Sequence, residues 1–241
     1  MPHNPQAILF DLDDTLISFK GVSNQAWKSS CTQFINTHAL SIPAAELLSA
    51  LAKTRRWYWG DPQRHKAGRE NMQNARREIV FLTFQSLGIA DEALSRELAD
   101  QYSACQQRMV HLFPNTLRVL SALRQNGYRL GLITNGSSAG QREKLSRFVL
   151  EPYFEIILID QEVGFSKPDI RIYEHARSLL NLRYQDLWMV GDNLVWDIQS
   201  PQSLGIYTVW YDAEKAGLPE NSPIMPDAAI QDISELFAML V

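Results

Sequence analysis

The stretch Ala7-Ile8-Leu9-Phe10, followed at once by Asp11-Leu12-Asp13-Asp14-Thr15-Leu16, decides the fold of this chain. Four apolar residues in a row predict a buried β-strand. Because side chains alternate along an extended segment, Asp11 and Asp13 are expected to point the same way. Clustered carboxylates at the end of a buried strand repel one another unless a cation accompanies them, and their oxygens suit Mg²⁺. Taken alone, the motif fits a turn rich in Asp and Thr equally well.

Three later segments have the same form, an apolar run that leads into polar or small residues. They end in Thr134-Asn135-Gly136, in Lys167-Pro168-Asp169 and in Gly191-Asp192-Asn193, with Asp197 shortly after the last. Apolar runs that alternate with amphipathic stretches predict a parallel sheet covered by helices. The expected strands are residues 7–10, 129–134, 156–159, 187–190 and 206–210. Ligands of such sheets lie at the carboxyl ends of the strands, so we expect the motifs to converge.

The middle of the chain, residues 19–113, has the pattern of helices throughout. Leu47, Leu48 and Leu51 recur at helical spacing after Ser41-Ile42-Pro43, and Asp61-Pro62 interrupts this helix. Asp91 is expected to cap a last helix before Phe113-Pro114 returns the chain to the sheet.

In order and spacing, the four segments resemble the motifs of the haloacid dehalogenase superfamily over nearly the whole chain. Gln141 and Lys144, which follow Thr134-Asn135-Gly136, resemble the branch with N-acylneuraminate phosphatase and pyrimidine 5'-nucleotidase. The resemblance implies an α/β fold: a Rossmann-like parallel sheet core of residues 1–18 and 114–241, with a helical cap of residues 19–113 inserted after the first motif.

The resemblance also implies roles for the motif residues. Asp11 is the expected nucleophile, which would form an aspartyl phosphate, and Asp13 the expected acid and base. The phosphate group would be held by Thr134, Asn135, Gly136 and Lys167, and Lys167 would also offset charge during catalysis. Mg²⁺ would be bound by Asp11, Asp13 through its carbonyl group, and Asp192. Asn193 and Asp197 would support these groups, Asp197 either by contacting the metal through a water molecule or by orienting Asn193 and Lys167.

One departure from the family pattern follows Asp197. The family usually has Gly and Ala on a tight helix start there, whereas this chain has Ser200-Pro201. Proline is tolerated in a first helical turn, so the change bears on local packing and on the position of Asp197 rather than on the motif itself.

Composition excludes several classes of partner. The 241 residues are 45% hydrophobic, with a net charge of -4 and no basic block, which argues against a nucleic acid polymer. No apolar run is long enough for a membrane span, and the N-terminus lacks the pattern of a signal peptide. The two cysteines match no metal or redox spacing. We therefore expect a cytoplasmic protein, a monomer or homodimer, whose partner is a small-molecule phosphate ester.

These expectations lead to an enzyme, a Mg²⁺-dependent phosphomonoester hydrolase. Its substrate would be a small phosphorylated metabolite such as a nucleoside monophosphate or a sugar phosphate. A phosphosugar mutase of the beta-phosphoglucomutase type, a flavin mononucleotide phosphatase and a non-catalytic protein that binds phospho-ligands are the alternatives. Within the expected cap, Arg55-Arg56-Trp57-Tyr58-Trp59 either contacts substrate or packs against neighbouring helices.

Overall fold

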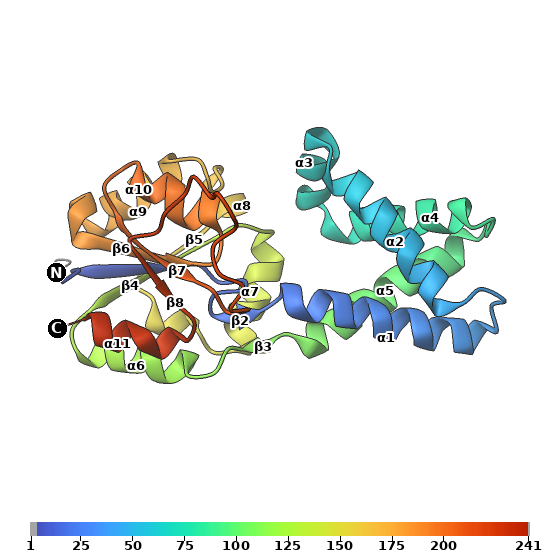
Figure 1. Ribbon diagram of the computed structural model, residues 1–241, viewed down its shortest axis with the longest axis horizontal. Coiled ribbons are helices and arrows are strands. Elements are labelled where there is room, and N and C mark those ends of the chain that lie inside the picture. The colour runs from blue at the N-terminus through green and yellow to red at the C-terminus, as the bar shows by residue number, and fades with distance from the viewer. Residues whose placement is uncertain (1–3, 241) are drawn as a thin grey trace. The chain divides into compact units, whose positions relative to one another are not determined.

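The computed structural model describes residues 4–240, apart from the side chains at positions 65, 66, 69 and 70. The chain forms two compact units, a core unit of Met1–Ser18 with His111–Val241 and a helical unit of Phe19–Val110 (Figure 1). The extreme ends of the expected core, residues 1–3 and 241, lie outside the described residues.

A short antiparallel ribbon marks both crossings between the units. Strand β2, Ile17–Ser18, pairs with strand β3, His111–Leu112, so that Ser18 lies opposite His111. The chain therefore returns to the core at His111 rather than at Pro114. The reason is the pairing itself, which a run of two residues is too short to reveal in the sequence.

The core unit contains a six-stranded parallel sheet in the order β5-β4-β1-β6-β7-β8. Strand β1, Ala7–Phe10, is completely buried at its centre, as its apolar sequence predicts. The other strands are β4 (Arg129–Thr134), β5 (Ile156–Ile159), β6 (Leu187–Gly191), β7 (Tyr207–Tyr211) and β8 (Ala228–Ile230). The expected α/β fold with a parallel sheet is confirmed, and β8 at the edge is an addition.

Helices cover both faces of this sheet (Figure 1). Helices α9 (Arg171–Leu180) and α10 (Ser200–Gln202) lie on one face, and α6 (Thr116–Gln125) and α11 (Leu236–Met239) lie on the other. Helices α7 (Ser138–Arg147) and α8 (Asp160–Val163) follow the ends of β4 and β5. Leu9, Ile133 and Met189 from the sheet pack against Tyr173 and Leu180 of α9 in one apolar cluster. This packing on both faces fixes the sheet that carries the motifs.

The helical unit has its own apolar core. Its helices are α1 (Lys20–His38), α2 (Ala44–Trp59), α3 (Pro62–Glu70), α4 (Met72–Ser86) and α5 (Glu92–Met109). Asp61 and Asp91 cap α3 and α5 by accepting hydrogen bonds from backbone N–H groups. Phe34, Leu47, Phe84 and Leu98 are buried together inside the unit. Within residues 4–240, no helix combines the length and the apolarity that a membrane span requires.

Candidate active site

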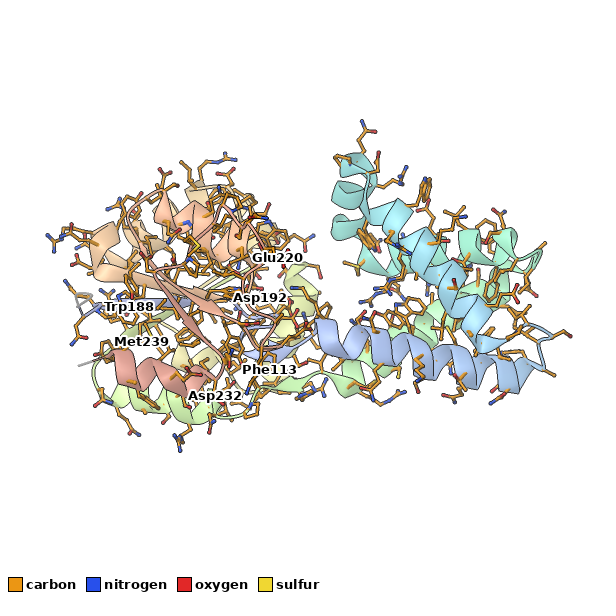
Figure 2. The ribbon with its side chains drawn as sticks, in the orientation of Figure 1. Phe113, Trp188, Asp192, Glu220, Asp232 and Met239 are labelled. Carbon is orange, nitrogen blue, oxygen red and sulfur yellow. The ribbon has the colours of Figure 1, made fainter. Side chains whose placement is uncertain are left out.

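The carboxyl edge of the sheet gathers the motif residues. Asp11 directly follows β1, Thr134 ends β4, and Asp192 directly follows β6, and these three strands are neighbours in the sheet. Asp192 is labelled at this edge in Figure 2. Parallel pairing alone therefore brings together residues that lie far apart in the sequence.

A buried lysine joins two buried carboxylates at this edge. The Nζ atom of Lys167 lies 2.6 Å from Oδ1 of Asp11 and 2.6 Å from Oδ1 of Asp197. Only 2% of Lys167, 6% of Asp11 and 1% of Asp197 is exposed. The hydroxyl group of Thr15 donates to the other oxygen of Asp11, at 3.1 Å. Both oxygens of Asp11 therefore have fixed partners, which sets the orientation of this carboxylate.

Burial and charge act against each other in this triad. Burial raises the pKa of Asp11 to about 6, Lys167 opposes this rise, and Asp192 and Asp13 add to it. Burial likewise raises the pKa of Asp197 to about 6, against the effect of Lys167. Burial disfavours the charged form of Lys167, yet the two carboxylates hold its pKa above the usual value. The lysine is therefore charged. Because the pKa of Asp11 is raised in spite of this lysine, a further positive charge near Asp11 would stabilise its carboxylate.

An unusual turn positions Asp197. Residues Leu194–Gln199 form a π-helical turn, a rare conformation that is frequent at functional sites. The side chain of Asn193 caps this turn by accepting from the N–H groups of Val195 and Trp196. The N–H group of Asn193 in turn donates to Oδ2 of Asp197. Asn193 therefore fixes Asp197, which is itself a member of the buried cluster with Asp11 and Lys167.

Ser200, which departs from the family pattern, takes part in the same support. Its hydroxyl group donates to the carbonyl of Pro168 at 2.6 Å, so it ties the end of the turn to the loop that carries Lys167. Pro201 lies in the first turn of α10, where proline is tolerated. The departure therefore adds a link between two motifs, and Asp197 keeps its contact with Lys167.

Three carboxylates are arranged so that they could hold a metal ion. One oxygen each of Asp11, Asp192 and Asp197 lies within 4.8 Å of the other two. An all-oxygen set of this kind suits a hard divalent cation. Asp11 and Asp197 also hold Lys167 between them, so all three carboxylates are candidate ligands. The indole N–H of Trp210 donates to the backbone carbonyl of Asp192 and fixes that ligand from the next strand.

The carboxylate of Asp13 has partners of its own. Its oxygens lie 2.7 and 2.8 Å from Nζ of Lys144, and the side-chain N–H of Gln141 donates to it at 3.0 Å. Lys144 also donates to the side-chain oxygen of Gln141. Helix α7 therefore holds Asp13 in one orientation, with two side chains one helical turn apart.

The residues expected to bind phosphate differ in whether their hydrogen-bonding groups are already engaged within the protein. The hydroxyl of Thr134 accepts from Gln141, which leaves its own proton available to a ligand. The side chain of Asn135 exchanges two hydrogen bonds with the backbone of Lys167, at 2.8 and 2.9 Å. The N–H of Gly136 donates to Asp160. Asn135 thus fixes the lysine loop, and the N–H of Gly136 is already engaged within the protein.

Three supporting residues were not expected from the sequence, namely Thr15, Asp160 and Trp210. Asp160 occupies the same position after β5 as Asp11 does after β1, which is a signal that could have revealed it. The role of Trp210 depends on the neighbouring strand, and no local pattern encodes it.

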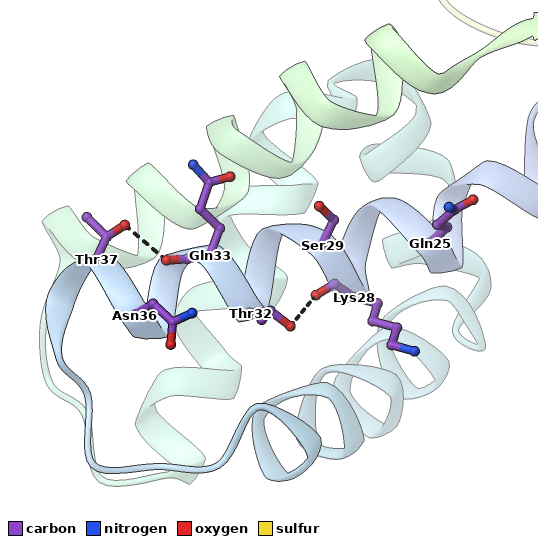
Figure 3. A pocket seen from close by; sticks show the side chains of 7 residues that line it. All are labelled: Gln25, Lys28, Ser29, Thr32, Gln33, Asn36 and Thr37. Carbon is purple, nitrogen blue, oxygen red and sulfur yellow. Dashed lines mark hydrogen bonds between the residues drawn. The ribbon is translucent and has the colours of Figure 1, made fainter.

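A shallow hollow lies elsewhere, on α1 of the helical unit (Figure 3). Two of its hydroxyl groups, those of Thr32 and Thr37, donate to backbone carbonyls of their own helix. Lys28 is its one charged lining residue among the side chains described. The hollow therefore lacks the convergent charge of the sheet edge.

Comparisons with known proteins agree with the motifs. A model of the haloacid dehalogenase-like hydrolases matches residues 5–205. A phosphoserine phosphatase of Thermus thermophilus is 33% identical over 198 residues, 82% of this chain and 70% of that protein. A glyceraldehyde 3-phosphate phosphatase of Methanothermobacter thermautotrophicus is 29% identical over 240 residues, 98% of this chain and 99% of that protein.

A solved structure shows the same fold. Magnesium-bound YfnB from Bacillus subtilis superposes with a TM-score of 0.71 at 21% identity, covering 98% of this chain and 99% of YfnB. Together with the family match, these likenesses confirm the expected resemblance and the expectation of a phosphatase-like enzyme.

We expect divalent cations to stabilise the chain in a manner that depends on pH. Folding raises the pKa of Asp11 and of Asp197 from 3.8 to about 6, so the folded chain binds more protons than the unfolded chain between these values. Without metal, their contribution to stability therefore falls as pH rises through this window. Because protons compete with the cation, Mg²⁺ should raise Tm by about 5 °C at pH 7.5 and much less at pH 5.

Thermal unfolding with Mg²⁺ or with EDTA at the two pH values checks this expectation. The variant Asp192→Asn should lose the rise at pH 7.5. An equal rise at both pH values, or one that survives Asp192→Asn, would contradict the assignment of the metal ligands.

We also expect Gly191→Ala to disrupt the cluster. A Cβ atom at Gly191 would lie 2.4 Å from Cβ of Asp197, so that carboxylate would have to move away from Lys167. The variant should lose about 1–3 kcal/mol of stability together with the Mg²⁺-dependent rise in Tm. In the matched control Gly131→Ala, the new Cβ meets the flexible end of Leu9 at 2.7 Å. That control should lose stability and keep the rise, and loss of the rise in both variants would contradict the local explanation.

Proposed function

The chain belongs to the haloacid dehalogenase-like hydrolase family, and on this premise we propose that it hydrolyses phosphate monoesters of small metabolites through an aspartyl phosphate on Asp11. One observation carries the proposal: the buried Asp11 carboxylate lies against the Lys167 ammonium group and within 4.8 Å of Asp192. A carboxylate is a poor nucleophile toward a phosphate dianion, because both are negative. Positive charge beside it removes this repulsion.

In the first step, an oxygen of Asp11 forms a bond to phosphorus while the bond from phosphorus to the alcohol oxygen breaks. Thr15 and Lys167 hold the carboxylate in a fixed orientation for this attack. Lys167 offsets negative charge on the transferring group, and the hydroxyl of Thr134 donates to one of its oxygens. The result is an aspartyl phosphate and a free alcohol.

Asp13 is the proton carrier of the proposal. It protonates the departing alcohol oxygen, and in the second step it accepts a proton from the water that attacks the aspartyl phosphate. This attack releases inorganic phosphate and restores Asp11. Lys144 and Gln141 support the role because they fix the orientation of the Asp13 carboxylate.

The cation of the proposal is Mg²⁺, and Asp11, Asp192 and the carbonyl group of Asp13 would hold it. When bound, it supplies positive charge to the nucleophile and to the phosphate oxygens. The oxygen-only donor set supports this choice, as does the magnesium named for the YfnB structure.

The proposed substrates are small phosphorylated metabolites such as nucleoside monophosphates and sugar phosphates. The relatives named for phosphoserine and for glyceraldehyde 3-phosphate support this class, since both of those compounds are small phosphate esters. A carboxylic acid at position 13 favours phosphate esters, because their leaving oxygen needs a proton.

A panel of phosphate esters tests the proposal. The purified chain should release inorganic phosphate with Mg²⁺, and EDTA should stop the release. Asp11→Asn should lower kcat by a factor on the order of 10⁴, because the covalent step has no substitute nucleophile. The matched control Asp14→Asn, in the same loop, should keep most of the activity. Isomerisation of a sugar phosphate without net phosphate release would instead indicate a mutase.

We further expect Asp13→Asn to discriminate between leaving groups. A departing alkoxide needs a proton, whereas p-nitrophenolate does not, so the variant should lose far more kcat/KM on ethyl phosphate than on p-nitrophenyl phosphate. Steady-state kinetics with both esters measures the ratio. Equal losses on the two substrates would argue against the acid role.

A further inference from the structure

A buried amide on helix α7 connects two groups of the core unit that the proposed function uses for different tasks. Gln141 lies in the first turn of this helix, and only 2% of it is exposed. Its Nε2 atom donates to the hydroxyl of Thr134 at 2.5 Å and to Oδ2 of Asp13 at 3.0 Å. The same nitrogen donates to the backbone carbonyl of Asn135 at 3.1 Å. One side chain therefore contacts both the hydroxyl proposed to hold phosphate and the carboxylate proposed to carry the proton.

The partners of this amide fix the direction in which it points. Ionised carboxylates and backbone carbonyls only accept hydrogen bonds, and Nε2 faces one of each, on Asp13 and Asn135. The amide oxygen faces the ammonium group of Lys144, which only donates, at 2.8 Å. If the amide were turned over, its oxygen would face acceptors and its nitrogen would face a donor. The orientation of Gln141 is therefore set by its surroundings.

This orientation also sets the direction of the hydrogen bond with Thr134. An amide nitrogen has no lone pair with which to accept, so Gln141 donates and the hydroxyl of Thr134 accepts. The proton of Thr134 then points away from the amide, and it is available to a phosphate oxygen at the carboxyl edge of the sheet. A hydroxyl without this donor could turn its proton toward the protein, and the phosphate oxygen would lose a hydrogen bond.

Asp13 receives a second support from the same helix. The Nζ atom of Lys144 lies 2.7 and 2.8 Å from the two carboxylate oxygens of Asp13. Charge-assisted hydrogen bonds of this kind are stronger than those between neutral groups. Lys144 therefore contributes to holding the acid, whereas Gln141 contacts the acid and the hydroxyl of Thr134 together.

The backbone beside Gln141 leaves room for the amide. Gly136 has a φ of +149°, which residues with a side chain rarely adopt, and a Cβ atom there would lie 3.0 Å from Cδ of Gln141. Ser137 caps the start of α7 by accepting from the N–H group of Gly140 at 3.2 Å. A missing side chain and a capped first turn thus keep Gln141 in its place between the two motifs.

We propose that Gln141 is a positioning residue shared by both halves of the site: it directs the O–H group of Thr134 toward the phosphate group and holds Asp13 for proton transfer. The inference rests on the proposed function, and it gives helix α7 a part in the reaction. Lys144 supports Asp13 alone, and Thr134 serves phosphate alone. A change at Gln141 should therefore affect two properties that changes at Lys144 and Thr134 affect singly.

Two measurements separate these properties. The first is the ratio of kcat/KM on p-nitrophenyl phosphate to kcat/KM on ethyl phosphate, which rises when the acid is misplaced, because only the alkoxide needs a proton. The second is the affinity of the full chain for inorganic phosphate with Mg²⁺, measured by calorimetry. It falls when a hydrogen bond to a phosphate oxygen is lost.

Three variants give the expected pattern. Lys144→Met should raise the ratio about tenfold and keep the phosphate affinity within about twofold. Thr134→Val should weaken phosphate binding about tenfold and keep the ratio within about twofold. Gln141→Met, which keeps the length of the side chain without its donors, should change both by about tenfold.

Two comparisons distinguish positioning from general damage to the fold. In a chain that already contains Asp13→Asn, adding Gln141→Met should leave the ratio unchanged, because this effect acts through Asp13. The control Arg147→Gln removes a positive charge from the exposed end of the same helix, and it should keep both properties. Thermal unfolding checks each variant, and Gln141→Glu, which has the same size and cannot donate, replaces Gln141→Met if that variant does not fold.

The outcomes decide the inference. It is overturned if Gln141→Met changes only one property or neither, or if it changes the ratio equally with and without Asp13. Loss of both properties in Arg147→Gln would overturn it as well, since any disturbance of α7 would then suffice. If the unchanged chain hydrolyses neither ester, the proposed function fails, and the support of the acid fails with it. Calorimetry with Thr134→Val and Gln141→Met then still decides whether Gln141 directs Thr134 toward phosphate.

Discussion

The ammonium group of Lys167 between two buried carboxylates is the interaction on which the arrangement of the core site depends. Removing one member of such a group would leave an uncompensated buried charge, which is far more costly than losing a surface ion pair. Each member comes from a different motif: Asp11 follows β1, Lys167 lies in the loop before α9, and Asp197 lies in the turn after β6. The triad thus links three segments that share no local sequence.

The surrounding hydrogen bonds serve this triad. Asn135 fixes the backbone of Lys167, Asn193 caps the turn of Asp197, and Ser200 ties that turn to Pro168. The bonds of Asn135 and Ser200 join a loop after one strand to a loop after another, whereas the bond of Asn193 stabilises the turn after β6 itself. The loops at the carboxyl edge therefore form one polar network, in which the position of any carboxylate depends on several strands.

The sequence predicted the central strands well because each is a short, fully apolar run that ends in a polar motif. It placed Asp11, Thr134 and Asp192 at one edge for the same reason, since parallel strands align their carboxyl ends. Strand β8 escaped because Ile230 is its one buried residue. The contact of Trp210 with Asp192 arises between two strands, and the closeness of Gly191 to Asp197 depends on the π-helical turn, so the sequence pattern revealed neither.

The ribbon of β2 and β3 has a consequence for how such chains can change. Ser18 and His111 are paired in the antiparallel ribbon, so the whole segment between them has the position of a hairpin loop in the core unit. The entropy of closing a loop grows only slowly with its length, by about 0.6 kcal/mol for each doubling. A short turn, a longer bundle or a different domain could therefore occupy this position without shifting the register of the central sheet. The segment between β2 and β3 can therefore be replaced by another unit while the six-stranded sheet keeps its structure.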